Sequence, residues 1–266
     1  MWKTNLRKIN LSEFKSFAVY SDTHLNQPHD HRTQAFLESL SGLPKVEAIF
    51  LAGDIFDFIY AKSPYFYDYW YKVFEALRAK RLKDNTKIYM IEGNHDFGFE
   101  HGTHDIYSSV FEAFGDTRIH TSHPKLGKIE ITHGDHIICP PSYHPFRNTI
   151  KSKLFQLVAG IVPGKIMNEI FTRYTRMARD PKSWKRLEKT FLKNCLSEYL
   201  KDTDIDTFIL GHIHVHLDTT IEGKRVLCGP GWFDSSSVLI VDARGKILRD
   251  WGSGGPGEHT ESYLYE

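Results

Sequence analysis

The sequence predicts an α/β fold with a β-sheet that is covered on both faces. Residues 16–136 alternate short apolar runs with helical patterns. The runs are almost continuously apolar, as in strands that are buried on both faces. From residue 205 onward the pattern changes to closely spaced strands. With 266 residues, 41% hydrophobic and 25% charged, the chain suffices for one elaborated domain or two small ones.

Four strands and three helices are expected in the first half. A strand over residues 17–21 is followed by the helical pattern HRTQAFLESL. After the strand AIFLAGD, apolar residues at helical spacing from Phe66 to Leu77 predict one amphipathic helix. The strand KIYMIEG precedes a short helix from Tyr107 to Phe114, which Gly115 should end. IEITHGD is the fourth strand.

The last part of the chain predicts strands joined by hairpins. The strand patterns are TFILGHIH, HLDTTIEG, KRVLCGP and SSVLIVDARGKIL. The pairs Glu222-Gly223 and Arg244-Gly245 supply turn residues between them. The Gly-rich tail, residues 251–266, is expected to be poorly ordered near its start.

Residues 144–201 form a basic segment between two strand patterns. They contain 13 basic and 4 acidic residues, a local charge of +9 in a chain of net charge +1. Three helical patterns follow one another: TIKSKLFQLVAGIVP, KIMNEIFTRYTRMAR and SWKRLEKTFLKNCLSEYL. We therefore expect a core made of residues 1–143 and 202–250, an amphipathic helical cap over 144–201, and the tail 251–266.

Composition limits the location and the partners. The three cysteines, Cys139, Cys195 and Cys228, cannot form an even disulfide framework, which favours a reducing cytoplasm. The first residues lack the apolar region of a signal peptide. No stretch reaches the ~20 apolar residues of a membrane-spanning helix. The near-neutral net charge gives no reason to expect a nucleic-acid partner.

Seven potential metal ligands stand at the ends of five predicted strands. They are Asp22, His24, Asp54, Asn94, His133, His212 and His214. Because ligand sites of α/β sheets form at the carboxyl ends of strands, these side chains should converge. Mixed oxygen and imidazole donors suit divalent Mn, Fe, Co, Ni or Zn. The sequence therefore predicts a site for two divalent ions, with the carboxylate of Asp54 as the natural bridge.

Two residues beside this set have expected catalytic roles. His95 follows Asn94 directly and should face the same cleft, where an imidazole stabilises a transition state or protonates a leaving oxygen. Asp96 is expected to fix the tautomer of His95. Glycines at 53, 93, 134 and 211 are expected to let the backbone turn sharply as it leaves each strand.

The motifs D-x-H, GD, GNHD, HGD and GHIH together resemble the calcineurin-like metallophosphoesterase family, across residues 16–241. The resemblance implies a sandwich of two β-sheets flanked by helices, with a dimetal centre at the strand ends. It also implies that one ion is held by Asp22, His24, Asp54 and His214, and the other by Asp54, Asn94, His133 and His212. A water activated by the two ions would attack phosphorus in line.

Within that family, the ligand spacing and the helical insertion after HGD resemble the UDP-2,3-diacylglucosamine hydrolases of lipid A synthesis. This implies a UDP-linked acylated sugar as substrate, manganese as the ion, and a peripheral position on the cytoplasmic face of the inner membrane. The candidates for holding the substrate's phosphates are Arg147, Arg173, Arg176 and Arg179.

The resemblance has one departure, because those enzymes carry Arg at the position of His95. Two alternatives therefore stay open. One is a soluble phosphodiesterase or nucleotide pyrophosphatase with a non-lipid substrate. The other is a scaffold protein that keeps the fold without catalysis, although no ligand is missing here.

Overall fold

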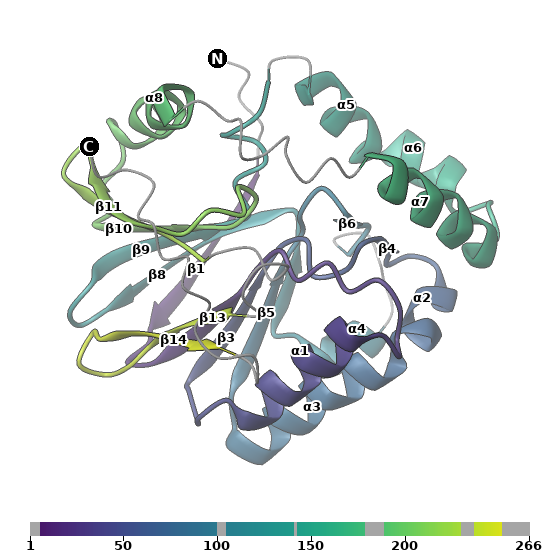
Figure 1. Cartoon of the computed structure of the whole chain (residues 1–266), viewed down its shortest axis with the longest axis horizontal. Coiled ribbons are helices and arrows are strands. Elements are labelled where there is room, and N and C mark those ends of the chain that lie inside the picture. Colours follow the sequence, from purple (N-terminus) through teal and green to yellow (C-terminus); the bar gives the residue numbers. More distant parts are fainter. Residues whose placement is uncertain (1–5, 100–104, 141–142, 179–188, 230–236, 252–266) are drawn as a thin grey trace.

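Two six-stranded β-sheets lie face to face in the computed structural model, and helices cover the outer face of each (Figure 1). The structure describes residues 6–99, 105–140, 143–178, 189–229 and 237–251. The implied sandwich of two sheets flanked by helices is confirmed. The predicted tail lies outside the described residues, except for Trp251 at the end of the last strand.

The first sheet, called the β3 sheet, has the order β14-β13-β2-β3-β5-β7. Its centre consists of parallel strands that carry the first three ligand motifs. The strands are β2 (Phe17–Tyr20), β3 (Ala48–Ala52), β5 (Lys87–Ile91), β7 (Ala113–Gly115), β13 (Ser237–Val241) and β14 (Ile247–Trp251). The antiparallel β13–β14 hairpin forms one edge, and Gly245 has a φ of 76° in its turn.

The second sheet, called the β9 sheet, has the order β1-β8-β9-β10-β12-β11. Its strands are β1 (Arg7–Glu13), β8 (Thr117–His123), β9 (Gly127–Thr132), β10 (Thr207–Leu210), β11 (Leu217–Ile221) and β12 (Lys224–Cys228). The predicted hairpin turn joins β11 and β12, with φ angles of 50° at Glu222 and 73° at Gly223. A separate two-stranded sheet pairs β4 (Ile59–Tyr60) with β6 (Asp96–Phe97).

Alternating side chains of the two sheets build three apolar layers. Phe17 and Phe50 point between the sheets and pack with Ile131. On the outer face of the β3 sheet, apolar side chains pack against three helices: α1 (His31–Gly42), α3 (Tyr71–Asp84) and α4 (Asp105–Val110). Burial on both faces explains why the strand patterns are almost continuously apolar.

Two helix predictions in the first half of the chain differ from the structure. The single helix expected from Phe66 to Leu77 is divided at the buried Trp70 into α2 (Pro64–Tyr69) and α3. The helix expected to reach Phe114 ends at Val110, because residues 113–115 pair with β5 as strand β7. In both regions, tertiary packing outweighs the local helical pattern.

The basic segment does not form one unit. Helices α5 (Tyr143–Ile150), α6 (Lys153–Ala159) and α7 (Gly164–Ala178) lie together on one side of the molecule, and α8 (Lys189–Leu200) lies on the other (Figure 1). Leu192, Leu196 and Leu200 of α8 pack against the β9 sheet. The cap, predicted over 144–201, is therefore limited here to α5, α6 and α7.

In the described ranges, no single helix combines the length and hydrophobicity of a membrane span. Helix α6 and residues 164–173 of α7, bent by 109°, reach them as a pair, by length and composition only.

Candidate metal centre

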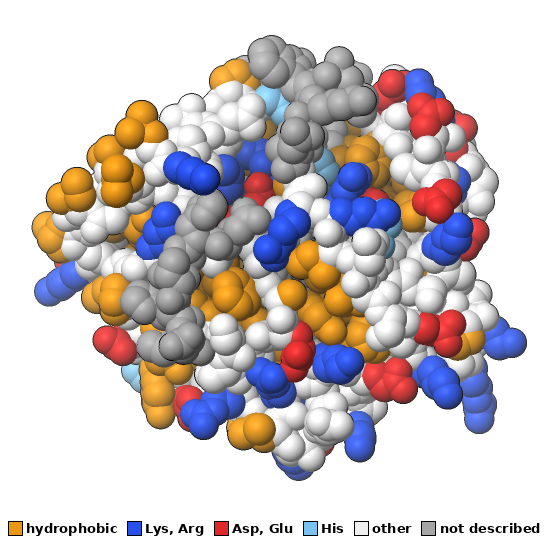
Figure 2. Space-filling model, turned by 180° about the vertical axis from the view of Figure 1, so that it is seen from behind, with side chains coloured by type: hydrophobic (Ala, Val, Ile, Leu, Met, Phe, Trp, Pro, Cys, Tyr) orange, Lys and Arg blue, Asp and Glu red, His pale blue; other side chains and the backbone are white. Residues whose placement is uncertain are grey.

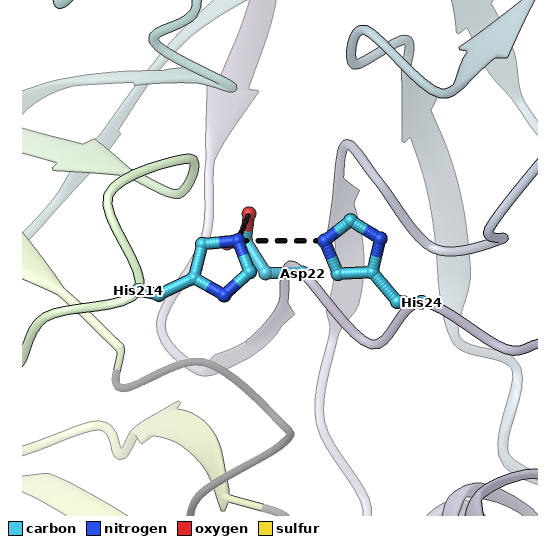
Figure 3. Close-up of side chains that lie close together, drawn as sticks. All are labelled: Asp22, His24 and His214. Carbon is cyan, nitrogen blue, oxygen red and sulfur yellow. Dashed lines mark hydrogen bonds and ion pairs between the residues drawn. The ribbon is translucent and has the colours of Figure 1, made fainter. Parts of the chain in front are cut away.

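Asp22, His24 and His214 form one half of a buried cluster at the strand ends (Figure 3). Asp22 and His24 follow β2, and His214 follows β10. His214 Nε2 lies 3.6 Å from Asp22 Oδ1 and 3.4 Å from His24 Nε2. The backbone N–H of His212 donates to both carboxylate oxygens of Asp22, at 2.8 and 3.0 Å. Two loops that are 190 residues apart in sequence therefore present three ligand atoms to one point.

The other half of the cluster contains Asp54, Asn94, His133 and His212. His133 Nε2 lies 3.2 Å from Asn94 Oδ1 and 3.5 Å from Asp54 Oδ2. Potential ligand atoms of Asp54, His133 and His212 lie within 4.8 Å of one another. The structure thus brings all seven predicted ligands into one cluster, in which five are buried and Asn94 and His214 are partly exposed.

Asp54 lies between the two halves. Its Oδ2 is 3.8 Å from His24 Nε2 in one half and 3.5 Å from His133 Nε2 in the other. Burial opposes ionisation, but the neighbouring imidazoles, His133 first, hold the pKa of the Asp54 carboxyl well below its usual range. Conversely, burial opposes a charge on His133, yet Asp54 raises the pKa of that imidazole to about 10. The carboxylates therefore favour positive charge at this point, which divalent cations supply.

Backbone carbonyls orient the imidazoles. A carbonyl oxygen only accepts, so His133 Nδ1 donates to Ala52 O at 3.1 Å and His212 Nε2 donates to Ile138 O at 3.1 Å. The opposite ring nitrogen of each is left to bind a cation, the arrangement found around metal-bound histidines. Burial lowers the pKa of His212 to about 4, which keeps it in the neutral form that ligates metals.

A carboxylate that sequence reasoning missed supports His24. Asp57 Oδ1 faces His24 Nδ1 at 3.5 Å, and Asp57 is 4% exposed. This contact directs His24 Nε2 toward Asp54 and His214. The signal was present in GDIFD, where a second aspartate follows Asp54 by three residues.

Five of the seven predicted ligands adopt a left-handed backbone. The φ angles are 53° at Asp22, 44° at His24, 51° at Asp54, 69° at His212 and 50° at His214. Non-glycine residues rarely adopt this conformation, and such strain concentrates at functional sites. Only two other described non-glycine residues share it, Asn85 and Glu222. Strained backbone is therefore concentrated at the residues that the motifs predict as metal ligands.

At two positions beside the predicted ligands, only glycine fits, because a side chain would collide with a ligand. A Cβ at Gly93 would lie 2.1 Å from Asp54 Oδ1, and a Cβ at Gly53 would lie 2.4 Å from His133 Nδ1. Gly53 also has a φ of 87°. Of the four glycines expected to turn the chain sharply, only Gly53 and Gly134 have positive φ; Gly93 and Gly211 instead leave room for carboxylates.

His95 faces the centre as predicted. Its Nδ1 donates to the carbonyl of Asp57 at 2.8 Å, and its Nε2 lies 3.9 Å from Asp54 Oδ2. Its backbone N–H donates to Asp54 Oδ1 at 2.9 Å. The side chain is 27% exposed, so the imidazole borders both the ligands and solvent.

The expected role of Asp96 is wrong. Its carboxylate accepts the backbone N–H groups of Ile55 at 2.9 Å and Phe56 at 3.1 Å, so it fixes the loop after Asp54 instead of His95. The Asp57 carbonyl takes the place that Asp96 was expected to fill. Burial, reinforced by the charge of Asp54, raises the pKa of Asp96 well above its usual range.

Arg147 is not placed to hold a substrate phosphate. It is 1% exposed, and its guanidinium donates to Asp135 at 2.7 Å and to Asp116 at 2.5 Å. Nearby, Lys151 donates to Glu92 at 2.6 Å and to the Asp96 carbonyl at 3.1 Å. These buried contacts attach the start of the cap to loops of the metal centre, so the prediction for Arg147 is corrected to a structural role.

The structure tests the phosphate-binding prediction less directly for the other three arginines. Arg173 is exposed on α7 and lines a cavity beside the loop that follows His24. Its role as a phosphate contact stays a prediction. The side chain of Arg176 and the whole of Arg179 lie outside the described residues.

Comparison with known proteins agrees with this geometry. The model of the calcineurin-like phosphoesterase family matches residues 15–216. The chain belongs to this family. Within it, the chain is 35% identical to a UDP-2,3-diacylglucosamine hydrolase of Pseudomonas savastanoi pv. phaseolicola, over 88% of this chain and 94% of that protein. It is 24% identical to a UDP-2,3-diacylglucosamine hydrolase of Psychromonas ingrahamii, over 73% and 78%.

The chain is therefore a hydrolase that acts on phosphoester bonds, and its family implies two divalent metal ions. The residues present fit them. Buried carboxylate, amide and imidazole donors converge, and the outer contacts of the imidazoles leave one nitrogen of each for a cation. The division of the ligands between two ions, as the family resemblance implies it, stays a prediction.

Proposed function

We propose that this chain hydrolyses the pyrophosphate bond of UDP-2,3-diacylglucosamine and releases UMP and 2,3-diacylglucosamine 1-phosphate. The observation that carries the proposal is the similarity to the Pseudomonas relative with that activity in its name. An alignment over 88% of this chain is too long to omit the cap, so the likeness extends beyond the metal motifs.

An exposed apolar ridge on the cap supports a lipid substrate. We define the ridge by seven apolar residues of α6, α7 and their connection: Leu154, Leu157, Val158, Ile161, Val162, Ile166 and Ile170. Leu154 is 72% exposed and Ile161 is 80% exposed. Hydrophobic side chains gather at the left edge of the view in Figure 2, the side on which α6 and α7 lie. A contiguous apolar patch of this kind marks an interaction surface.

The charge beside the ridge favours an anionic membrane surface as its partner. Lys153 and Lys165 are exposed at the starts of α6 and α7. Apolar side chains that enter the acyl boundary, together with lysines that meet anionic headgroups, are typical of peripheral membrane binding. We propose that the ridge contacts the cytoplasmic face of the inner membrane, where an acylated substrate is available.

The chain's own residues have separable tasks in the reaction. Two divalent ions, manganese in our proposal, would be held by the seven ligands and would supply Lewis-acid activation of water and phosphate. Asp54 is kept ionised by its imidazole neighbours. His95, fixed by the Asp57 carbonyl, presents Nε2 to the metal centre, where it would stabilise charge on the phosphoryl group or protonate the leaving oxygen.

A second candidate is a phosphodiesterase or nucleotide pyrophosphatase with a non-lipid substrate. His95 favours it, because the resembled lipid A enzymes carry Arg at this position. Such an enzyme would use the same metal centre and would leave the ridge without a role in catalysis.

The test is to incubate manganese-loaded protein with UDP-2,3-diacylglucosamine in detergent micelles and to measure UMP. UDP-N-acetylglucosamine, which lacks the acyl chains, and bis(p-nitrophenyl) phosphate serve as matched substrates. We expect UMP from the acylated compound and much less from its unacylated counterpart. Equal cleavage of both sugar nucleotides, or cleavage of the generic diester alone, would replace the lipid proposal with the second candidate.

A further inference from the structure

A cavity of about 220 Å³, lined by residues with polar side chains, lies between the loop after β2, helix α2 and helix α7. Amide, hydroxyl and charged side chains of both signs line it: Asn26, Gln27, Tyr69, Asn168, Glu169, Thr172 and Arg173. The side chains of Tyr69 and Asn168 form a hydrogen bond between α2 and α7. This polar lining contrasts with the apolar ridge on the same cap.

Helix α7 presents three different faces at i, i+4 spacing. Ile166 and Ile170 belong to the exposed ridge. Met167 and Phe171 pack against the apolar core. Asn168 and Thr172 line the cavity. One helix therefore separates an apolar outer surface from a polar inner one.

Both walls of the cavity are connected to loops that carry the metal centre. Asn26 follows His24 by two residues, so their Cα atoms are at most ~7 Å apart. The loop is fixed to the Asp54 loop, because Leu25 N–H donates to Ile55 O at 2.9 Å and Asp57 N–H donates to Leu25 O at 2.9 Å. On the other wall, Phe171 stacks on Phe58, next to Asp57, with ring centroids 3.9 Å apart.

We propose that this cavity binds the nucleoside end of the substrate, and the proposal rests on the proposed function. A pyrimidine such as uracil offers two carbonyl acceptors and one N–H donor, and the side-chain amides of Asn and Gln supply both complementary groups. Thr172 and Arg173 are suited to ribose and phosphate oxygens.

The size of the cavity agrees with one polar moiety. Its volume of about 220 Å³ is below the ~300–1,000 Å³ of pockets that hold whole drug-sized ligands. The acylated sugar would instead extend toward the apolar ridge. With one polar and one apolar end held apart, the pyrophosphate between them is directed to the metal centre.

Product inhibition tests this assignment without the lipid substrate. Hydrolysis of bis(p-nitrophenyl) phosphate is measured with UMP or ribose 5-phosphate as inhibitor, since the two differ only in the base. In the wild type, UMP should inhibit at a lower concentration than ribose 5-phosphate. Asn168→Ala and Gln27→Ala should each weaken UMP inhibition by about 5- to 10-fold, through lost hydrogen bonds, and leave ribose 5-phosphate inhibition unchanged.

Ile170→Ala is the matched control, because it alters the ridge face of the same helix and should leave both inhibition constants unchanged. Equal inhibition by UMP and ribose 5-phosphate in the wild type, or unchanged UMP inhibition in both cavity variants, would overturn the subsite. If UDP-2,3-diacylglucosamine is cleaved in that case, only the subsite is wrong. If the lipid is not cleaved but UMP inhibition depends on Asn168, the proposed substrate fails and the nucleoside site stands.

Discussion

The metal centre and the cap hairpin of α6 and α7 are built in opposite ways. At the centre, Asp22, Asp54 and His133 are at most 2% exposed, and their carboxylates and imidazoles are held by backbone hydrogen bonds, close glycines and left-handed backbone. On the hairpin, the ridge residues are 36% to 80% exposed. The metal ligands thus lie in the buried part of the fold, and the proposed lipid contact lies on an exposed surface.

A buried ion network joins the two regions. Arg147 at the start of the cap contacts Asp116 and Asp135, and Lys151 contacts Glu92, two residues before Asn94. A buried arginine between two carboxylates holds its position strongly, because removing it leaves unpaired buried charge. The cap is therefore attached to the loops that carry the ligands.

The largest effect should come from Asp54→Asn, which breaks the metal centre and leaves the cap intact. Metal-dependent turnover of bis(p-nitrophenyl) phosphate should fall by about 10³-fold, because the charge shared by both ligand groups is lost. Circular dichroism checks the fold. Full activity in the variant would remove Asp54 from the bridging position.

Next, Arg147→Ala tests the connection between the regions. It should lower the free energy of unfolding by about 3 to 5 kcal/mol, because Asp116 and Asp135 lose their buried partner. Chemical denaturation measures this. If Arg147 bound a phosphate as first predicted, the variant would instead raise KM with unchanged stability.

His95→Ala separates chemistry from metal binding within the centre. Turnover should fall by about 10²-fold, as expected when a positioned acid or hydrogen-bond donor is removed. The metal content, measured by elemental analysis, should stay at the wild-type value. Loss of metal would show that His95 is itself a ligand.

Leu157→Asp tests the cap alone. Binding to anionic phospholipid vesicles should weaken by about 10-fold through lost apolar burial, and hydrolysis of the soluble diester should be unchanged. Leu82→Asp is the matched control, because Leu82 is 71% exposed, close to the 68% of Leu157, but lies on α3, away from the ridge. Equal vesicle binding by both variants would contradict the docking of the ridge.

Glu130→Gln gives the smallest effect and lies outside both regions. Burial opposes ionisation of Glu130, but hydrogen bonds from His120 and Tyr199 lower its pKa below the ordinary 4.5. Ionised Glu130 therefore stabilises the fold above pH 4.5, and this contribution is lost as the pH falls through its folded-state pKa. The variant should be less stable by about 1 kcal/mol at pH 7, and thermal unfolding should show the difference shrinking toward pH 3.

The sequence predicted the buried strands and the ligand cluster because both depend on repeated local signals, whereas the two-sheet sandwich was implied only by the resemblance to the family. Apolar runs ending in Asp, Asn or His mark the strand ends regardless of tertiary contacts. Strands β1 and β8 were missed for a physical reason. In β8, buried and partly exposed side chains alternate, and the buried ones are Thr117, Ile119, Thr121 and His123. Because only one of these four is apolar, the alternation does not appear as a hydrophobic pattern in the sequence.

Partner choice among charged residues could not be predicted from the sequence. The identity of Asp96 does not show that its oxygens accept the N–H groups of Ile55 and Phe56. Likewise, Arg147 follows the pattern of a solvated basic helix but is buried against two carboxylates that come from other loops. Such pairs depend on long-range geometry, which neither spacing nor composition encodes.

The most direct test of the dimetal centre is a crystal structure of the manganese-loaded protein with anomalous scattering data. Two anomalous peaks are expected about 3.5 to 4 Å apart, one on each side of the Asp54 carboxylate, with His24 and His214 around one and Asn94 and His133 around the other. A single peak, or peaks away from Asp54, would contradict the account.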